Sequence, residues 1–378
     1  MILNVKEFQN LCKVISNAVD TADENAANLE LAAENNCLRL NVTNTEYYVS
    51  AKFNLPDVEK LHATVPAKKF LDLIAGLTTT EITLTTENNN VKLRAGKSSY
   101  KIPMIFENEE VTTLNPIVIQ NTNVEMNISI DVLRSINKVN SAELTKAKTN
   151  NFQQNELQKY YYITEEGCFT YTNGACLNKF TLEKPVKMLL NERIVKLFKL
   201  FNEDVKFALG HDADLSGGYK TKISFETDNI YLAAYITNDD ILLNKIQGPY
   251  TATKNFIREN YPSKLVLSTL NLKNAVSRLM TFSKTDKAAG TNNLFMAKIN
   301  FTETELVIKD KLENTEVINI EAGSITDINY SLSLNLIDVK AVLDSCSDDF
   351  ITLNCGNHRS VVITRGNISN LIPEGIDR

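Results

Sequence analysis

Residues 65–77 read VPAKKFLDLIAGL, and this pattern predicts a short amphipathic helix. Pro66 suits a first helical position, where no amide hydrogen is required. The apolar residues recur at helical spacing and form one face: Phe70, Leu73, Ile74 and Leu77. Lys68 and Lys69 lie off that face. The open side of the helix therefore carries two adjacent cations, although the whole chain has a net charge of −6.

The same pattern recurs along the chain, each time with an apolar face and with lysine or arginine off it. The other predicted helices are residues 5–19, 129–140, 189–201, 270–283 and 334–346. Their starts lie about 62 residues apart, except for one gap of about 80, and such a period is typical of a repeat architecture. In chain order, the cations on the open faces are Lys6, Lys13, Lys68, Lys69, Arg134, Lys138, Lys196, Lys199, Lys273, Arg278 and Lys340.

Alternating β-branched and aromatic runs follow the helices and are broken by polar turns. The clearest runs are residues 81–104, 159–182 and 348–366. Each repeat therefore predicts one helix and several mostly antiparallel strands, and the repeats, taken in pairs, predict an α+β fold of three similar domains. Two polar segments that contain proline fit the linkers: residues 107–123 and 247–264. We place the three domains at residues 1–118, 119–250 and 251–378.

Composition and charge exclude several classes of protein. Hydrophobic residues make up 43% and charged residues 23% of the chain, as in an ordinary globular protein. No run reaches the roughly 20 apolar residues of a membrane helix, and the N-terminus shows no signal peptide, so we expect a cytoplasmic protein that binds no membrane. The six cysteines form no Cys-x-x-Cys pair. Nucleotide-binding and hydrolase motifs are absent, and we expect no catalytic residue, no cofactor and no metal.

The cationic helix faces have two interpretations. Lysine and arginine on the open side of amphipathic helices are the commonest arrangement in any protein, so these faces are ordinary solvated surfaces in the first interpretation. In the second, the repeats close into a ring and their helices line a common interior, which attracts a polyanion while the outside stays acidic. Contacts of lysine and arginine to phosphate carry no base information. The second interpretation therefore predicts sequence-independent binding of duplex DNA.

Four segments carry a resemblance to a known family. The most specific spans residues 62–104, where ATVPAKKFLDLIAGL is followed by EITLTTENNNVKLRAGKSSYKIPM. Looser matches are YTNGACL (171–177), KIQGPYTATKNFI (245–257) and NLIPEGIDR (370–378). Together they resemble the bacterial β sliding clamp, the β subunit of DNA polymerase III, over essentially the full length.

The resemblance implies a head-to-tail homodimeric ring that encircles duplex DNA in the nucleoid and catalyses nothing. As a processivity factor in DNA replication, the ring would tether the replicative DNA polymerase, and an ATP-driven clamp loader would open and close it. Partners would bind a hydrophobic cleft through a short peptide with a glutamine and a Leu-Phe-like end. Carried over, the cleft comprises Leu157, Thr172, Gly174, Ala175, Leu177, Phe256, Leu371, Ile372 and Pro373. The same residues, Leu157 and Leu177 above all, also fit an ordinary core.

Two further features bear on the resemblance. Asn173, Ala175 and Cys176 stand where the family has Asp, His and Arg, and Thr251-Ala252 stands where it has Pro-Asp, so the chemistry of the cleft is altered. The family's dimer contact joins the edge of the first domain to the third domain. The corresponding residues are Tyr100, Ile102 and Met104 in the segment 98–106, and Phe282 at the end of a predicted helix.

A second hypothesis is a non-replicative binding protein or an enzyme on an inherited clamp-like scaffold. Its chemistry would have to use His62, His211 or His358, placed near carboxylates. A structure that brings two of them together in a pocket would favour this hypothesis.

Overall fold

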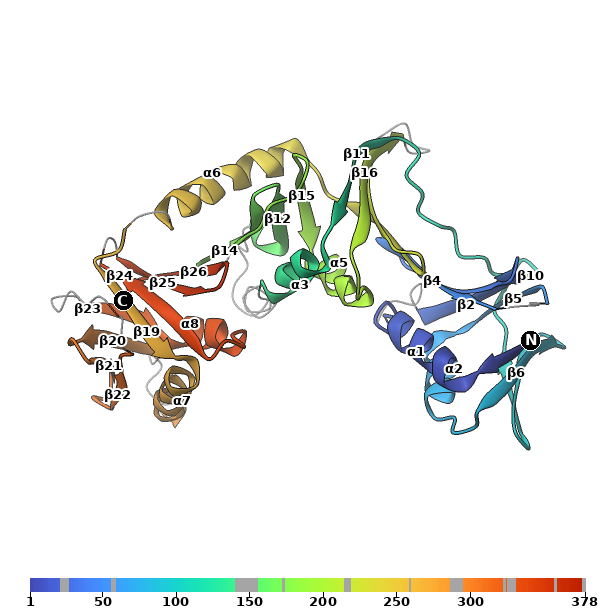
Figure 1. Ribbon diagram of the computed structural model, residues 1–378, viewed down its shortest axis with the longest axis horizontal. Helices are drawn as coiled ribbons and strands as arrows, with labels where there is room; N and C mark the ends of the chain where they lie inside the picture. The colour runs from blue at the N-terminus through green and yellow to red at the C-terminus, as the bar shows by residue number, and fades with distance from the viewer. Residues whose placement is uncertain are drawn as a thin grey trace. The chain divides into compact units, whose positions relative to one another are not determined.

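The computed structural model describes residues 1–20, 27–55, 59–139, 156–171, 174–213, 219–257, 260–285, 295–321, 324, 331–356 and 359–375 (Figure 1). Within these residues one order of elements recurs six times: a strand, a helix and three strands. We call each recurrence a module and number the modules one to six along the chain. The six predicted helices are confirmed, each within a few residues of its expected ends.

The modules follow one another in three pairs. Modules one and two contain β1 Ile2–Asn4, α1 Val5–Ser16, β2 Asn28–Glu34, β3 Cys37–Thr43, β4 Tyr47–Asn54, β5 Leu61–Pro66, α2 Ala67–Ala75, β6 Glu81–Glu87, β7 Asn90–Ala95 and β8 Ser98–Pro103. Modules three and four contain β11 Thr122–Ile128, α3 Ile130–Lys138, η2 Glu156–Lys159, β12 Tyr160–Thr164, β13 Gly167–Tyr171, β14 Ala175–Lys179, β15 Lys187–Asn191, α5 Glu192–Leu197, η3 Phe198–Leu200, β16 Val205–Ala213, β17 Tyr219–Glu226 and β18 Ile230–Ile236. Modules five and six contain β19 Ser263–Ser268, α7 Thr269–Thr285, β20 Met296–Phe301, β21 Glu305–Asp310, β22 Thr315–Asn319, β23 Ser331–Asn335, α8 Leu336–Asp344, β24 Phe350–Cys355, β25 Ser360–Arg365 and β26 Ile368–Pro373. Between pairs lie a small hairpin, β9 Phe106–Glu107 with β10 Glu110–Val111, and the helix α6 Asp240–Phe256.

Within a pair, the two modules exchange their first strands. β1 joins the sheet β6-β7-β8, and β5 joins β4-β3-β2. The same exchange places β11 beside β16, β15 beside β12, β19 beside β24 and β23 beside β20. Because each first strand belongs to its neighbour's sheet, the modules of a pair form one folding entity, as the α+β prediction of three similar domains requires.

Two further strand pairings join successive pairs of modules. β18 pairs antiparallel with β4, which gives an eight-stranded sheet in the order β11-β16-β17-β18-β4-β3-β2-β5. β14 pairs antiparallel with β26, which gives the eight-stranded sheet β15-β12-β13-β14-β26-β25-β24-β19. The remaining sheets have four strands, β1-β6-β7-β8 and β22-β21-β20-β23. As a result the contacts divide the chain into two compact units: the first unit is residues 1–134 and 193–237, and the second unit is residues 135–192 and 238–378.

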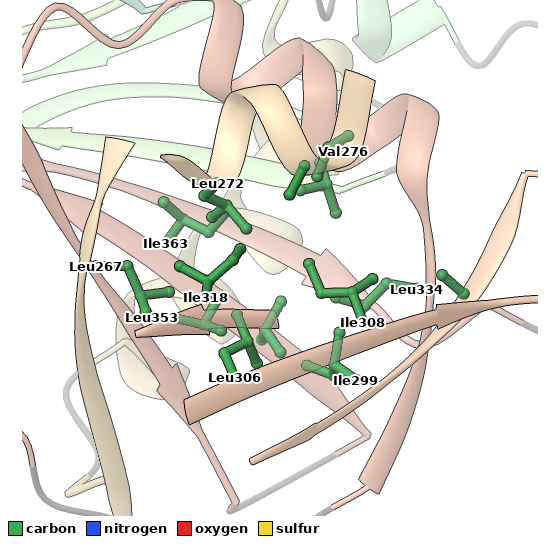
Figure 2. Packing of buried hydrophobic residues seen from close by; sticks show 14 of the residues in the cluster. Leu267, Leu272, Val276, Ile299, Leu306, Ile308, Ile318, Leu334, Leu353 and Ile363 are labelled. Atoms are coloured by element: carbon green, nitrogen blue, oxygen red, sulfur yellow. The ribbon is translucent and has the colours of Figure 1, made fainter. Parts of the chain in front are cut away.

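The core of modules five and six shows why these sequences form these elements. Leu272 and Val276 lie one helical turn apart on α7 and are fully buried against strand residues such as Ile299 and Ile363 (Figure 2). The strands alternate buried and exposed residues, as the pattern Glu305–Asp310 with buried Leu306 and Ile308 illustrates. Each such aliphatic side chain stabilises the fold by about 1.5–3 kcal/mol through burial.

The prediction of a linker over residues 247–264 is wrong for its first half, which belongs to α6. Asp239 caps the helix by accepting a hydrogen bond from the amide of Ile241 at 2.7 Å. The helix buries Leu242, Ile246 and Tyr250, and this packing outweighs the unfavourable Pro249 in its interior. The predicted domain boundary between residues 250 and 251 lies inside α6, and the domain boundaries stay a prediction.

The other expected linker, residues 107–123, is fastened to one face of the sheet in the first unit. Leu114 and Ile117 are buried against Tyr48 and Ala233. Tyr231 donates a hydrogen bond from its hydroxyl to the carbonyl oxygen of Ile117 at 2.9 Å. The segment is thus polar in sequence, as predicted, but two buried apolar residues hold it on the sheet.

Candidate functional site

The lysines of α1 and α2 form an exposed cationic surface in the first unit. α1 buries one stripe that includes Phe8, and α2 buries one that includes Phe70; the two rings meet edge to face at 6.1 Å. Gln9 fastens the helices by donating hydrogen bonds to two carbonyl oxygens at the end of α2, those of Ile74 and Leu77, each at 2.9 Å. The opposite sides carry the exposed lysines Lys6, Lys13, Lys68 and Lys69. Within the described residues no ion pair neutralises these four, so their charge is available to a polyanion.

The cations of α3, α5 and η3 are also exposed. They are Arg134, Lys138, Lys196 and Lys199. Arg134 lies 3.7 Å from Asp131 on the same helix, an exposed pair of the kind that contributes little to stability. Sequence reasoning missed Arg193, whose guanidinium lies 3.1 Å from Asp20 and 3.8 Å from Glu46. Arg193 therefore holds α5 against neighbouring elements of the first unit instead of contributing a free charge.

The cations of α7 and α8 are already neutralised by carboxylates in the second unit. Lys273 and Lys340 both contact Asp344, at 3.0 and 2.9 Å. Partial burial acts to raise the pKa of the Asp344 carboxyl, but the hydrogen bonds from these two lysines outweigh it and lower the pKa below its ordinary value. Arg278 binds both carboxylate oxygens of Glu316, and its hydrogen bonds lower the pKa of that carboxyl. The predicted cationic faces are therefore unequal.

The predicted partner cleft lies in the second unit, and most of its residues are covered. Leu157, Ala175 and Leu177 are buried in one apolar cluster together with side chains of α6. Gly174 and Phe256 are half-buried, Leu371 packs on the edge of the cluster and Pro373 is exposed. Thr172 lies outside the described residues.

The structure separates one predicted cleft residue from the rest. Successive side chains of a strand point to opposite faces, so β26 sends Leu371 and Ile372 in different directions. Leu371 packs on the cluster of Leu177, whereas Ile372 is buried in the core of modules five and six. The sequence places the two residues side by side, and only the strand geometry shows that they cannot line one surface.

A pocket of about 400 Å³ borders the same cluster, since Leu177 and Tyr250 help to line it. Tyr250 and Lys254 of α6 form one wall, and Leu177 and the turn residue Glu166 form another. Lys254 and Glu166 are an ion pair. The pocket combines an apolar floor with charged groups at its rim, which suits the end of a peptide more than a buried reaction centre.

Comparison with known proteins identifies the family. The family model for the N-terminal domain of the DNA polymerase III beta subunit matches residues 4–115. A beta sliding clamp of Helicobacter pylori strain J99 is 23% identical over 282 residues, which are 73% of this chain and 70% of the relative. The crystal structure of the Helicobacter pylori beta clamp bound to a DNA ligase peptide aligns with 100% of this chain and 99% of that chain, with a TM-score of 0.72 and 17% identity. DNA polymerase III subunit beta from Borrelia burgdorferi aligns with 100% of this chain and 98% of that chain, with a TM-score of 0.75 and 13% identity.

Residues 4–115 belong to the family of the DNA polymerase III beta subunit, and the whole chain has the fold of the β sliding clamps. The whole-chain likeness is carried by the fold more than by sequence identity. Its relatives are beta sliding clamps and beta subunits of DNA polymerase III. The α+β fold of three similar clamp domains is confirmed.

The residues expected at a clamp dimer contact differ in accessibility. β8 is an edge strand of its four-stranded sheet, and Tyr100 is exposed on it. Ile102 is buried opposite Val91 and supports the sheet itself. Met104 is half-buried just beyond the strand, and Phe282 on α7 is 50% exposed. Tyr100 and Phe282 are therefore the predicted contact residues that a second clamp subunit can reach.

The two histidines within the described residues, His62 and His211, do not form a common site. His62 Nε2 lies 2.8 Å from the buried carboxylate of Glu30, which also accepts a hydrogen bond from Asn41. His211 contacts the hydroxyl of Thr221 at 2.9 Å on a different region of the sheet. His358 lies outside the described residues. Among the residues that the structure describes, no group of histidine, cysteine and acidic side chains could hold a metal ion.

The cysteines are structural within the described portion of the chain. Burial raises the pKa of the Cys12 and Cys355 thiols to about 12, so both stay protonated and unreactive at neutral pH. Five of the six free cysteines are buried and Cys346 is half-buried.

Proposed function

We propose that this chain is a DNA sliding clamp: a homodimeric ring that encircles duplex DNA without reading its sequence and tethers a DNA polymerase. The observation that carries the proposal is the pattern of sheet joints. In both eight-stranded sheets the outer strands are the first strands of modules, and the joint is made by last strands, β18 with β4 and β14 with β26. Each four-stranded sheet has the first strand of a module at one edge and a last strand at the other edge.

Among the residues that the structure describes, two last strands lack the partner strand that the other four have. β8 and β22 are the last strands of modules two and five, and each is the edge of a four-stranded sheet. Pairing of β8 with β22 of a second copy would complete an eight-stranded sheet of the same kind, and it would cover two edges that otherwise invite aggregation. Val317 on β22 is 53% exposed, and α7, which carries Phe282, packs against that strand. Two such joints close a head-to-tail ring of two chains.

The DNA surface is proposed from the helix cations. Lys6, Lys13, Lys68, Lys69, Arg134, Lys138, Lys196 and Lys199 are exposed on helices of successive modules, in a chain whose net charge is −6. Cations on helices and an acidic remainder favour phosphate contacts on the helical side only. Topological closure allows each contact to stay weak, because the ring cannot leave a closed circle while it slides.

The proposed partners follow from the family. They are duplex DNA, a second copy of the chain, a DNA polymerase and an ATP-driven clamp loader that opens the ring. The DNA ligase peptide bound to the Helicobacter pylori clamp supports a peptide-binding surface as the attachment point for further partners. We place the protein in the cytoplasm, associated with the nucleoid. No helix in the described residues has the length and apolar character needed to span a bilayer.

We further propose domains at residues 1–118, 119–250 and 251–378, with α6 connecting the second to the third. The pairing of modules supports three domains, and α6, Asp240–Phe256, spans the proposed boundary between the second and the third.

The test of the proposed function is topological retention. The purified chain, a clamp loader and ATP are incubated with a nicked circular duplex, and bound protein is separated by gel filtration. We expect the chain to stay on the circle and to run off once a restriction enzyme linearises it. Equal retention on circular and linear DNA would show a binding protein that does not encircle DNA.

A further inference from the structure

Two cations lie directly opposite each other on adjacent strands of the first unit. Arg39 on β3 is the cross-strand partner of Lys52 on β4. Like charges in this position are unfavourable, because the Cβ atoms of such a pair lie only about 5 Å apart. Among the residues that the structure describes, no ion pair neutralises either cation, and Arg39 is exposed. An anion bound between the two side chains would remove this repulsion.

The pair lies on the face of the sheet that α1 leaves uncovered. Leu38 and Leu40 on β3 are fully buried, and α1 packs against β3 and β4. Side chains alternate along a strand, so Arg39 points to the opposite face. These two cations are thus separate from the helix cations that are proposed to contact DNA, and the proposed function gives them no role.

The equivalent ladder position in the second unit holds an apolar pair. β3 and β13 both begin directly after a two-residue turn, and Arg39 and Phe169 are the third residues of these strands. The cross-strand partner of Phe169 is Leu177, which takes the place of Lys52. Phe169 and Leu177 belong to the apolar cluster that contains most of the predicted partner cleft. Modules one and three therefore carry surfaces of different character at equivalent places, one cationic and one apolar.

Two further cross-strand cation pairs show how such a pair is otherwise accommodated. Lys92 on β7 lies opposite Lys101 on β8, and the carboxylate at the end of β6 forms an ion pair with Lys92. Lys298 on β20 lies opposite Lys309 on β21, and Glu313 forms an ion pair with Lys309. In both pairs the protein supplies a carboxylate to one of the two cations. The pair on β3 and β4 differs from them in this respect.

We propose that Arg39 and Lys52 form a docking site for a short acidic segment of a partner protein. A guanidinium binds a carboxylate through two parallel hydrogen bonds, and the ammonium supplies a second positive charge beside it. Ala32 is the next residue in the same row, on β2, and its small side chain leaves the guanidinium accessible. The site does not depend on ring closure, and it would give a partner an attachment point outside the predicted cleft.

The charges around the pair favour an acidic protein segment over a nucleic acid. Glu34 at the end of β2 is exposed, and so is Asp228. Asp228 precedes Asn229, whose carbonyl oxygen accepts a hydrogen bond from the amide of Lys52 at 2.7 Å. A continuous polyanion would be repelled by these carboxylates, whereas a segment with few acidic side chains can place them on the two cations alone.

The test is affinity labelling of lysines in the full chain. The probe is a peptide of six glutamates with one amine-reactive ester at its N-terminal end, and the labelled lysines are quantified by mass spectrometry. Each yield is divided by the yield with the same ester on a peptide of six serines, which corrects for the reactivity of each amine. At low salt we expect this ratio to be at least about fivefold higher for Lys52 than for Lys309, whose charge Glu313 already neutralises.

Variants of the arginine test the site while the lysine that reports on it stays in place. Arg39→Gln should lower the ratio of Lys52 to that of Lys309, and Arg39→Lys, which keeps the charge, should retain at least half of it. Lys298→Gln removes one charge from the control pair and should leave the labelling of Lys52 unchanged. The melting temperature should be retained or raised in Arg39→Gln, because loss of a like charge relieves repulsion.

Three outcomes would overturn the inference. They are equal ratios for Lys52 and Lys309 in the parent chain, unchanged labelling of Lys52 in Arg39→Gln, and displacement of the probe from Lys52 by single-stranded oligothymidine at a lower concentration than by unlabelled hexaglutamate. The last result would show a nucleic-acid surface instead. Retention on circular DNA should be the same in Arg39→Gln as in the parent, so it reports on the proposed function separately.

Discussion

The unequal neutralisation of the helix cations predicts that DNA binding is concentrated on one portion of the predicted surface. We compare two double variants that each remove two positive charges. Lys68→Gln/Lys69→Gln removes two exposed lysines of α2 that have no ion pair among the described residues. Lys273→Gln/Lys340→Gln removes two lysines that both contact Asp344. The change in net charge is the same, so any difference between the variants reflects local pairing.

The magnitude follows from counterion release. Each phosphate contact contributes about 0.9 to the slope of log affinity against log salt concentration. Loss of both α2 lysines should therefore lower the slope by about 1.8, which corresponds to an affinity about 60-fold lower near 0.1 M salt. The group of Lys273, Lys340 and Asp344 has a net charge of +1, from two cations and one anion. On DNA this group displaces at most one counterion. Removal of its two lysines should therefore lower the slope by about 0.9 or less.

The assay is equilibrium binding of a fluorescently labelled duplex, measured by anisotropy between about 50 and 200 mM salt. Urea unfolding of each variant serves as the folding control, because surface substitutions typically change stability by about 0.5 kcal/mol or less. An equal loss of slope in both variants would refute the reasoning from local ion pairs. An unchanged slope in the α2 variant would refute the DNA surface itself.

Three further predictions concern stability and assembly. Burial alone would raise the pKa of Asp212, but hydrogen bonds from two backbone amides and from a lysine lower it from 3.8 to about 2. Because the folded pKa is depressed, about 2 kcal/mol of stability is present above pH 4 and is lost as the pH falls toward 2; urea unfolding should show this loss in the parent and not in Asp212→Asn. Gly174→Ala would place a Cβ atom 2.2 Å from the carbonyl oxygen of Leu371, so we expect a destabilisation of about 3 kcal/mol in thermal unfolding. Gly76→Ala is the control: the atom nearest to its Cβ would lie at 3.6 Å, so its stability should be nearly unchanged. Phe282→Asp should shift the chain from dimer to monomer in analytical ultracentrifugation with its melting temperature retained; a dimer that persists would argue against the proposed joint.

The helices were predictable because their information is local. In α1, the apolar residues Phe8, Cys12 and Ile15 recur at helical spacing in the sequence, and all three are buried in the structure. The run of strands after each helix was predictable for the same reason. α6 was missed because Gly248 and Pro249 are local signals for a linker, whereas the packing of Leu242 and Ile246 that holds the helix involves residues far away in the sequence.

The chemistry of the surfaces was less predictable than the fold. Arg278 was expected to face DNA because its helical position is open, but Glu316, which neutralises it, lies on a strand 38 residues away. Leu177 was expected in a cleft, and the helix that covers it was itself expected to be a linker. In both cases the availability of the side chain depends on which distant element packs beside it, and a single sequence does not contain that information.

The sheet joints connect these observations. A module cannot close its own sheet, because its first strand belongs to its neighbour and its last strand is an edge until another module pairs with it. Within the described residues, four of the six last strands pair with each other in the same chain, as β18 with β4 and β14 with β26. The other two, β8 and β22, remain at the edges of their sheets. This pattern of pairing leaves two edges unpaired among the described strands, β8 of module two and β22 of module five. If a second copy satisfies them, the number of chains in the ring is set by the angle through which each joint turns, and not by any additional contact. Lengthening the edge strand β22 should therefore alter the strength of the dimer without altering the number of its subunits.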